Sequence, residues 1–309
     1  MNDNRKPRLS GNWASLLLPI NADESIDFAR LSQAIDVLIA AGVDGIYSNG
    51  TASEFYAQTE AEFDAIQAQL AEKCRAAGMS FMIGASQTDP VLQLARIRRA
   101  AALRPRAIQV ILPDWWPVSN EEARTFLLRA SEAAEGTELV LYNPPHAKRV
   151  LAPSDIAVAT AGTAVTATKL SLVGETFYAE ARRHLQHLAV FVPGHHLATG
   201  VREGVAAGAF SNIACLSPRG AQRWTDMMAS DLDTALEWEG RIRAFITEHI
   251  LPFAQAGYSN AALDKLLASI GGWADVGTRL RMPYGSIDAA EVPALRRAAR
   301  ALIPEIMSA

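Results

Sequence analysis

The sequence predicts an α/β fold, a (β/α)8 TIM barrel with a C-terminal helical extension, and three observations predict it. Amphipathic helical stretches repeatedly end at a glycine or another helix-stopping element, and a short apolar run follows each end. Eight such runs occur by about residue 230, and they are apolar almost throughout, as expected for parallel strands buried on both faces. Residues 231–309 then show helical patterns without strands. An open, doubly wound sheet is the alternative, but eight βα units favour a closed barrel.

The predicted strands follow one another at a regular distance. Their junctions with the preceding helices lie 21 to 36 residues apart, which is the length of one βα unit. The strands are expected at residues 12–20, 43–47, 79–86, 106–112, 137–142, 163–170, 188–192 and 209–214.

The helices between these strands carry their own start signals. Thr59 with Glu62, and Ser119 with Glu122, have the spacing of a capping box ahead of an apolar helical repeat. Residues 28–38 also place apolar side chains at helical spacing. These signals predict helices after the first, second and fourth strands.

The chain is expected to hold a barrel over residues 1–230 and a helical extension over residues 231–309, both in one structural unit. Three helical stretches make up the extension, at residues 233–250, 259–272 and 289–307. No low-complexity linker separates them from the barrel.

Composition excludes several classes of function. The chain has 309 residues, half of them hydrophobic, and a formal net charge of -4, so a basic footprint for nucleic acid or an anionic membrane is missing. It contains only two cysteines, Cys74 and Cys215, which predicts no disulfide framework and a reducing compartment. Neither a signal peptide nor an apolar run of membrane-spanning length is evident. We therefore expect a cytoplasmic protein with no nucleic-acid or membrane partner.

Lys169, in "TKLS", lies at the end of the sixth predicted strand and is the strongest candidate for a catalytic residue. In a barrel the carboxyl ends of the strands converge on the active site. Burial there would lower the pKa of the amine and let it attack a carbonyl carbon. The alternative is a solvated lysine whose stem covers apolar surface.

Two neighbouring segments strengthen this hypothesis. Tyr142 ends the fifth strand, so its phenol is expected beside Lys169 on the adjacent strand. The second strand delivers "SNGT", residues 48–51, in which Gly50 permits close backbone approach and Thr51 adds a hydroxyl, so a small carboxylate would fit there. An ordinary helix entry is the alternative for this loop.

Three motifs in register resemble one known family. "NGTASEF" is similar to its Gly-Ser/Thr-Thr-Gly-Glu loop, "YNPP" to its Tyr-Asn-x-Pro segment and "TKLS" to its Schiff-base strand. The family is that of dihydrodipicolinate synthase and N-acetylneuraminate lyase, (β/α)8 lyases, commonly tetrameric, that form an imine between a lysine and pyruvate or another 2-oxo acid. The resemblance implies that Lys169 forms the imine, that Tyr142 relays the proton and that Thr51 with its neighbouring amides binds the 2-oxo acid carboxylate.

The chain departs from the family pattern around the second substrate. Ala52 and Ser53 stand where the family loop has threonine and glycine, and "DWW" (residues 114–116) stands where the synthases have a relay tyrosine. Ala147 occupies the position of the arginine that binds the aldehyde's carboxylate, with Lys148 and Arg149 next to it. The residues that the resemblance assigns to imine formation are therefore present, whereas the positions that bind the second substrate differ from the family pattern.

The seventh strand ends in "PGHH", where family members often have acidic residues that hold a polyhydroxylated substrate. Metal binding by His195 and His196 is disfavoured because no further Cys or His cluster supports it, and substrate contact by His196 is the better interpretation. The substrate-binding candidates are Ser48, Asn49, Gly50, Ala52, Gly194, His196 and Ser211.

The sequence thus predicts a Schiff-base lyase, an aldolase or dehydratase, that acts on pyruvate or a 2-keto-3-deoxy sugar acid. It would need neither a cofactor nor a metal and would form a homo-oligomer, a dimer or a tetramer. Trp115 and Trp116 also suggest an aromatic aldehyde partner, although a subunit interface is the plainer explanation for them. The alternatives are a dihydrodipicolinate synthase proper and a non-catalytic barrel that binds a 2-oxo acid or has a regulatory role.

Overall fold

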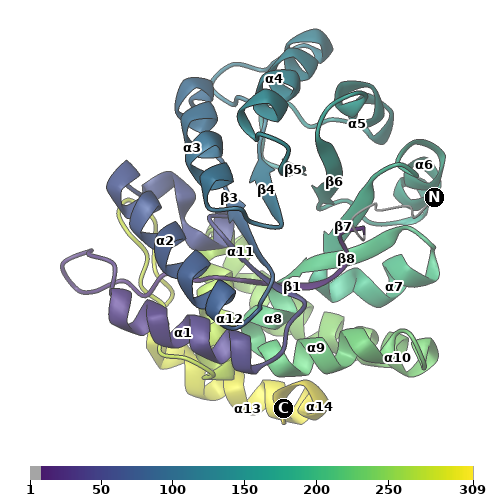
Figure 1. Cartoon of the computed structure of the whole chain (residues 1–309). Helices are drawn as coiled ribbons and strands as arrows, with labels where there is room; N and C mark the ends of the chain where they lie inside the picture. The colour runs from purple at the N-terminus through teal and green to yellow at the C-terminus, as the bar shows by residue number, and fades with distance from the viewer. Residues whose placement is uncertain (1–7, 309) are drawn as a thin grey trace.

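Eight parallel strands close into a barrel in sequence order, as the computed structural model of the chain shows (Figure 1). The structure describes residues 8–308, so the first seven residues of the predicted barrel range and the last residue of the predicted extension lie outside the described residues. The predicted (β/α)8 barrel with C-terminal helices is confirmed. The strands are β1 (Gly11–Ser15), β2 (Gly45–Ser48), β3 (Phe81–Gly84), β4 (Ala107–Val110), β5 (Glu138–Asn143), β6 (Val165–Leu170), β7 (Ala189–Pro193) and β8 (Ala206–Ser211).

Helices surround the barrel and continue past its last strand. Those of the barrel are α1 (Phe28–Ala40), α2 (Glu60–Ala76), α3 (Pro90–Ala102), α4 (Asn120–Ala133), α5 (Pro153–Thr160), α6 (Glu175–His184), α7 (Leu197–Arg202), α8 (Asn212–Leu216) and α9 (Pro218–Met227). Those that follow are α10 (Leu232–Phe245), the π-helical turn η4 (Ile246–Ile250), α11 (Leu251–Gln255), α12 (Asn260–Gly271), α13 (Val292–Leu302) and α14 (Pro304–Met307). Short 3-10 turns are η1 (Thr51–Ser53), η2 (Phe55–Ala57), η3 (Gly194–His196) and η5 (Ala289–Glu291).

Capping accounts for several of the helix boundaries. Both predicted capping boxes form, with Thr59 and Glu62 at the start of α2 and Ser119 and Glu122 at the start of α4. Each box satisfies backbone N–H groups that the first helical turn leaves without a partner. The sequence signal therefore fixes these two boundaries.

Two of the three apolar clusters of the core are separated by the strands. One fills the barrel and includes Trp13, Met82, Val140, Ala167 and Phe191, while the larger one lies between the strands and the helices. Because successive strand residues point to opposite faces, the residue two positions after an interior residue also points inward. This alternation directs the side chains that end β5 and β6 toward the barrel axis.

The C-terminal helices pack against the barrel rather than forming a separate layer of their own. α12 packs on α8 and on η1, and α13 packs on α12 and α10. In Figure 1, α13 and α14 lie at the lower edge of the molecule. The extension therefore contacts the same end of the barrel that the sequence marks as the candidate site.

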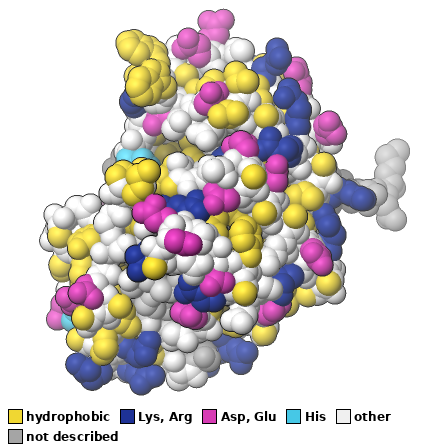
Figure 2. Space-filling view, turned by 90° about the vertical axis from the view of Figure 1, so that its left-hand side faces the viewer, with side chains coloured by type: hydrophobic (Ala, Val, Ile, Leu, Met, Phe, Trp, Pro, Cys, Tyr) yellow, Lys and Arg dark blue, Asp and Glu magenta, His cyan; other side chains and the backbone are white. Residues whose placement is uncertain are grey.

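The surface carries charges of both signs. Figure 2 shows acidic and basic side chains interspersed over one face of the molecule. Cys74 and Cys215 are both buried and both free. Within residues 8–308, no helix is long and apolar enough to cross a membrane.

Candidate active site

A cavity of about 460 Å³ lies at the carboxyl ends of the strands, and we call it the Lys169 cavity. Side chains at or near six strand ends line it: Ser15, Tyr47, Tyr142, Lys169, Pro193 and Ser211. Helices α8 and α12 supply further lining residues, among them Cys215 and Asp264. The cavity is therefore built jointly by the barrel and the C-terminal extension.

The Lys169 amine lies among aromatic rings. Its Nζ donates a hydrogen bond to the hydroxyl of Tyr47 at 3.3 Å and lies 4.3 Å from the ring centroid of Tyr142. The rings of Tyr47 and Phe210 are each 5.2 Å from Nζ. Lys169 follows the interior residue Ala167 by two positions, so strand alternation turns it into the cavity.

This environment changes the acidity of the amine. Loss of hydration lowers the pKa of Lys169 to about 8, and the carboxyl group of Asp264 partly opposes that shift. An aromatic ring stabilises a cation less than the hydration that the amine loses on burial. A larger fraction of the Lys169 amine is therefore neutral than of a solvent-exposed lysine at the same pH. A nucleophilic amine is the chemical consequence.

Tyr142 and Lys169 are direct register partners on β5 and β6. The Tyr142 ring faces the amine, whereas its hydroxyl is hydrogen-bonded to the side chain of Thr51. Burial raises the pKa of Tyr142, and the hydrogen bond with Thr51 partly counteracts this shift. The phenol therefore stays protonated and points toward the loop after β2.

The loop after β2 contributes only part of its predicted set to the Lys169 cavity. Thr51 and Ala52 line the cavity, whereas Ser48, Asn49 and Gly50 do not. Ser48 is fully buried and its hydroxyl donates to Gln67 of α2, because alternation turns it outward from the inward-facing Tyr47. The Asn49 amide donates to Gln58 at 3.0 Å. These two polar side chains hold the loop in place from behind.

Gly50 serves close packing here. A Cβ at this position would lie 2.6 Å from the ring of Tyr47, so any larger residue would displace that ring. Its own backbone is extended, with φ at -77°, and the left-handed positions of the loop are Asn49 and Glu54, both with φ at 52°. The physical requirement for Gly50 is thus space for Tyr47.

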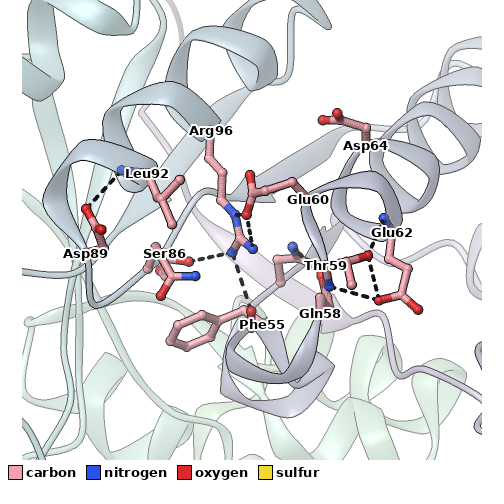
Figure 3. Close-up of polar contacts among 12 residues, drawn as sticks. Phe55, Gln58, Thr59, Glu60, Glu62, Asp64, Ser86, Asp89, Leu92 and Arg96 are labelled. Atoms are coloured by element: carbon pink, nitrogen blue, oxygen red, sulfur yellow. Dashed lines mark hydrogen bonds and ion pairs between the residues drawn. The ribbon is translucent and has the colours of Figure 1, made fainter. Parts of the chain in front are cut away.

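Two ion pairs, one of them fully buried, fix this loop from two sides. Arg96 of α3 pairs with Glu60 at 2.8 Å and donates to the backbone oxygens of Phe55 and Ser86, as Figure 3 shows. On the other side, Glu54 accepts from Lys265 of α12 at 2.5 Å, and both side chains are almost completely buried. The loop is therefore held between α3 and α12.

A second arginine clamps the same loop from the C-terminal segment. Arg281 donates to Glu62 and to the backbone oxygen of Ala57, and its own backbone N–H donates to Glu54. This ion pair, together with the helix cap at Thr59, lowers the pKa of Glu62 to about 2. The cap of α2 and the C-terminal segment are thereby joined.

The seventh and eighth strands deliver Gly194, His196 and Ser211 to the Lys169 cavity, together with His195. Gly194 approaches the start of α8 closely, since a Cβ there would lie 2.6 Å from the Asn212 side chain. Burial lowers the pKa of His196 to about 4, and the neighbouring His195 adds to this shift. At neutral pH this wall carries uncharged imidazoles.

The hydrogen bonds of Asn212 determine the tautomer of His195. The backbone N–H of His195 donates to Asn212 Oδ1 at 3.2 Å, so the amide nitrogen of Asn212 faces the ring and donates to Nδ1 at 3.0 Å. The neutral ring then carries its proton on Nε2.

Among residues 8–308, no group of three or more His, Cys, Asp or Glu side chains is arranged to hold a metal ion.

A second cavity of about 450 Å³, here the Arg149 cavity, shares Thr51, Tyr142 and Asn260 with the first. Ala147 and Arg149 line this second cavity. Arg149 donates to Asn120 at 2.5 Å and lies 3.4 Å from Asp155, so its guanidinium already has partners.

The neighbours of Arg149 face the surface. Lys148 is exposed and donates to the backbone oxygen of Trp115 at 2.6 Å. Trp115 and Trp116 are 83% and 78% exposed and line neither cavity. An aromatic aldehyde held by these two rings within one chain is therefore not supported.

Several side chains of the Lys169 cavity were missed by the sequence reasoning, among them Tyr47, Cys215 and Asp264. For Tyr47 a signal existed, because inward-facing positions of a strand alternate and the residue sits one before Ser48. Burial raises the pKa of the Cys215 thiol well above its ordinary value. Burial also raises the pKa of Asp264 to about 7, although the nearby Lys169 charge opposes the shift. No local pattern marks these two residues of the helical region.

Comparison with solved structures shows the same fold. YagE, a prophage protein of the dihydrodipicolinic acid synthase family from Escherichia coli K12 solved in complex with pyruvate, superposes with a TM-score of 0.81 at 19% identity, over 95% of this chain and 98% of that chain. N-acetylneuraminate lyase from Fusobacterium nucleatum gives a TM-score of 0.81 at 16% identity, over 95% and 99% of the two chains.

Sequence comparison covers less of the curated relatives. N-acetylneuraminate lyase from Citrobacter koseri is 28% identical over 138 residues, which are 44% of this chain and 46% of the relative. The match thus spans about half the length of that relative. The model of the Dihydrodipicolinate synthetase family, in contrast, matches residues 8–302. The match extends over the barrel, the strand-end motifs and most of the helical extension, and the resemblance inferred from three motifs is confirmed: the chain belongs to the dihydrodipicolinate synthetase family.

Proposed function

We propose that the chain is a Schiff-base lyase, an aldolase or dehydratase, that acts on pyruvate or a 2-keto-3-deoxy sugar acid through an imine with Lys169. The observation that carries this proposal is the placement of the Lys169 amine in a cavity among the rings of Tyr47, Tyr142 and Phe210. The pKa of about 8 leaves roughly 9% of the amine neutral at pH 7, about 300-fold more than the ordinary value of 10.5 would. A lysine that only covered apolar surface would not need such an environment.

The reaction follows from the chemistry of a buried amine. Lys169 attacks the C2 carbonyl carbon of the 2-oxo acid, and the resulting carbinolamine loses water to give a protonated imine. In an aldolase the C3–C4 bond breaks, its electron pair moves to the imine to give an enamine, and the C4 hydroxyl loses its proton as the aldehyde leaves. In a dehydratase C3 loses a proton to give the enamine, and hydroxide then leaves C4. The enamine that remains in the aldolase is protonated, and in both cases hydrolysis by one water releases the product and the free amine of Lys169. Lys169 is itself the electron sink, and the reaction requires no cofactor.

Tyr142 and Thr51 are assigned the proton transfer and the carboxylate. The Tyr142 hydroxyl is bonded to the Thr51 side chain, so both groups face one substrate position. The first hydrogen bond of η1 runs from the Ser53 N–H to the Gly50 oxygen at 3.1 Å, so the N–H groups of Thr51 and Ala52 precede it. We assign the substrate carboxylate to these two amides and the Thr51 hydroxyl. Tyr142 then relays the proton next to the imine.

The part of the Lys169 cavity formed at the ends of β7 and β8 suits substrate hydroxyl groups better than a second anionic group. Gly194, His196 and Ser211 lie there, and the low pKa of His196 keeps its ring uncharged at neutral pH. Neutral imidazoles and hydroxyls donate and accept hydrogen bonds, which suits the hydroxyls of a deoxy sugar acid. This is the basis for assigning His196 and Ser211 to substrate binding.

The same proposal includes the assembly and the compartment. Trp115 and Trp116 project almost fully exposed, and aromatic residues of this kind are enriched at subunit interfaces. We assign them to a homo-oligomer, a dimer or a tetramer, which light scattering on the wild-type chain and on a Trp115→Ser/Trp116→Ser variant tests. The two free buried cysteines suit the reducing cytoplasm.

Borohydride reduction tests the covalent step. The protein is incubated with pyruvate, reduced and analysed by intact mass, with a panel of 2-keto-3-deoxy acids in parallel. A covalent adduct that maps to Lys169 and disappears in Lys169→Ala supports the enzyme. A wild-type chain that forms no adduct with any of several 2-oxo acids would favour the non-catalytic barrel, and an adduct on Lys148 or Lys265 would move the chemistry elsewhere.

A further inference from the structure

Helix α12 forms one complete wall of the Lys169 cavity. Asn260, Leu263, Asp264 and Leu267 line the cavity, and their spacing of i, i+3, i+4 and i+7 is one face of an α-helix. Among the described residues that line this cavity, Asp264 is the only carboxyl group. A single negative charge therefore faces the amine from a helix outside the barrel strands.

Asp264 and Lys169 face one cavity without contacting each other directly. In the described part of the chain, the Lys169 amine donates to Tyr47, and the Cys215 thiol is shared between the Asp264 carboxyl and the backbone oxygen of Ser211, which lies 3.8 Å from Sγ. The two groups interact through their charges, which partly counteracts the effect of burial on each. Because both groups are buried, this interaction is screened less than one at the surface.

The position of Asp264 is fixed by its neighbour in the sequence. Lys265 forms the buried ion pair with Glu54 and also donates to the backbone oxygen of Arg279 at 2.5 Å. This pair joins α12 to the loop that carries Thr51, so the carboxyl group and the candidate carboxylate site are held on one rigid frame. The position of Asp264 is therefore fixed relative to the loop that carries Thr51.

We propose that Asp264 is the counter-ion of the positive charge that Lys169 carries as an ammonium and, after imine formation, as a protonated imine. This inference rests on the proposed Schiff-base function. A protonated imine surrounded by aromatic rings loses its proton readily, because burial disfavours the charged form. A neutral imine is a poor electron sink, so a nearby carboxylate that retains the proton promotes the bond-breaking step.

Other titratable groups around the pair are in states that leave the carboxylate as the dominant partner. Tyr47 and Tyr142 have raised pKa values and stay neutral, as does the thiol of Cys215, and the lowered pKa values of His195 and His196 keep their rings neutral. The charge of Lys169 is thus opposed mainly by Asp264.

The experiment removes the charge and keeps the shape. The pH dependence of the Lys169 amine is measured with 2,4-pentanedione, which condenses with a neutral amine to a vinylogous amide with loss of water, and the reaction of Lys169→Ala is subtracted. Asp264→Asn should lower the midpoint of this profile by about one pH unit or more. Labelling should therefore become several-fold faster between about pH 7, above which Asp264 is ionised, and the wild-type midpoint of about 8, and should change little at lower pH, where the carboxyl is protonated. Asp264→Glu, which keeps the charge, should stay near the wild-type midpoint.

Turnover should change in the opposite direction. With a substrate found in the 2-keto-3-deoxy acid panel, kcat of Asp264→Asn should fall at least tenfold and should fall further as the pH rises, because the imine loses its proton more easily. A purely structural role would slow labelling and turnover together. Cys215→Ala, which removes a hydrogen-bond donor and leaves the Asp264 carboxylate in place, serves as the matched control. Its labelling profile should have a midpoint close to that of the wild type.

The outcomes separate this inference from the proposed function. If Asp264→Asn labels with an unchanged or higher midpoint, the counter-ion role is overturned while the lyase remains. If the wild-type chain forms no pyruvate adduct, the proposed function itself fails. Circular dichroism checks the fold, and Asp264→Ser provides the same loss of charge should the asparagine variant not fold.

Discussion

The Lys169 amine lies over the ring of Tyr142, 4.3 Å from its centroid, while the Tyr142 hydroxyl is hydrogen-bonded to the side chain of Thr51. The two residues are register partners on neighbouring strands. One side chain thus has two separate functions: its ring contacts the amine, and its hydroxyl faces the site assigned to the substrate carboxylate. Substitutions can separate these two functions.

Tyr142→Phe removes the hydroxyl and keeps the ring. We expect the pyruvate adduct on Lys169 to form, whereas turnover falls by about 10²- to 10⁴-fold, as for loss of a general acid–base group. Intact mass after reduction and steady-state kinetics are the two measurements. A kcat close to that of the wild type would show that another group moves the proton.

Lys265→Met breaks a fully buried ion pair and leaves the Glu54 carboxylate without its cationic partner. We expect the free energy of unfolding to fall by about 3–5 kcal/mol, measured by urea denaturation, because an uncompensated buried charge is costly. The double variant Glu54→Gln/Lys265→Met should regain part of this loss. Lys148→Met, at an exposed site, is the control and should change stability by no more than about 0.5 kcal/mol. Equal effects at both lysines would show that the buried pair does not hold α12 to the loop.

His196→Asn tests the part of the Lys169 cavity formed after β7. The pKa of His196 is about 4, below the ordinary 6.5, so the ring is already neutral from about pH 5.5 to 7 and contributes no ionisation in that range. We expect the KM for a 2-keto-3-deoxy sugar acid to rise about tenfold, the worth of one hydrogen bond, with the shape of the pH profile unchanged in that range. An acidic limb that is present in the wild type and absent in the variant would contradict this assignment.

The chain should be a poor dihydrodipicolinate synthase. Ala147 replaces the expected arginine, Arg149 is already bound to Asn120 and Asp155, and Lys148 is held by Trp115 at the surface. Loss of a charge-assisted contact costs about 1.5–3 kcal/mol, and Ala52 with "DWW" leaves the relay incomplete, so kcat/KM should be more than about a hundredfold below that of a physiological substrate.

The assay for this prediction combines pyruvate with aspartate semialdehyde and couples the product to a dihydrodipicolinate reductase. A kcat/KM of about 10⁴–10⁵ M⁻¹s⁻¹, ordinary for a natural substrate, would refute the prediction. The Tyr142→Phe variant gives the background rate.

Local sequence was enough to determine the barrel and the pair at its centre. Continuous apolar runs, the helix caps at Thr59 and Ser119 and the spacing of the units predicted the closed fold, and strand ends predicted that Tyr142 and Lys169 lie side by side. These features depend on hydrogen-bonding patterns and on alternation along a strand, which are properties of neighbouring residues.

Tertiary packing decided the rest of the candidate site. Ser48 was expected at the site, yet the alternation that turns Tyr47 inward turns Ser48 toward Gln67. Asp264 and Cys215 reach the Lys169 cavity only because α12 packs on α8 and is fixed by the pair of Lys265 with Glu54. The rotation of a helix about its axis is set by the side chains it meets across the interface, which lie far away in the sequence. For that reason, which face of α12 turns toward Lys169 follows from the folded structure alone.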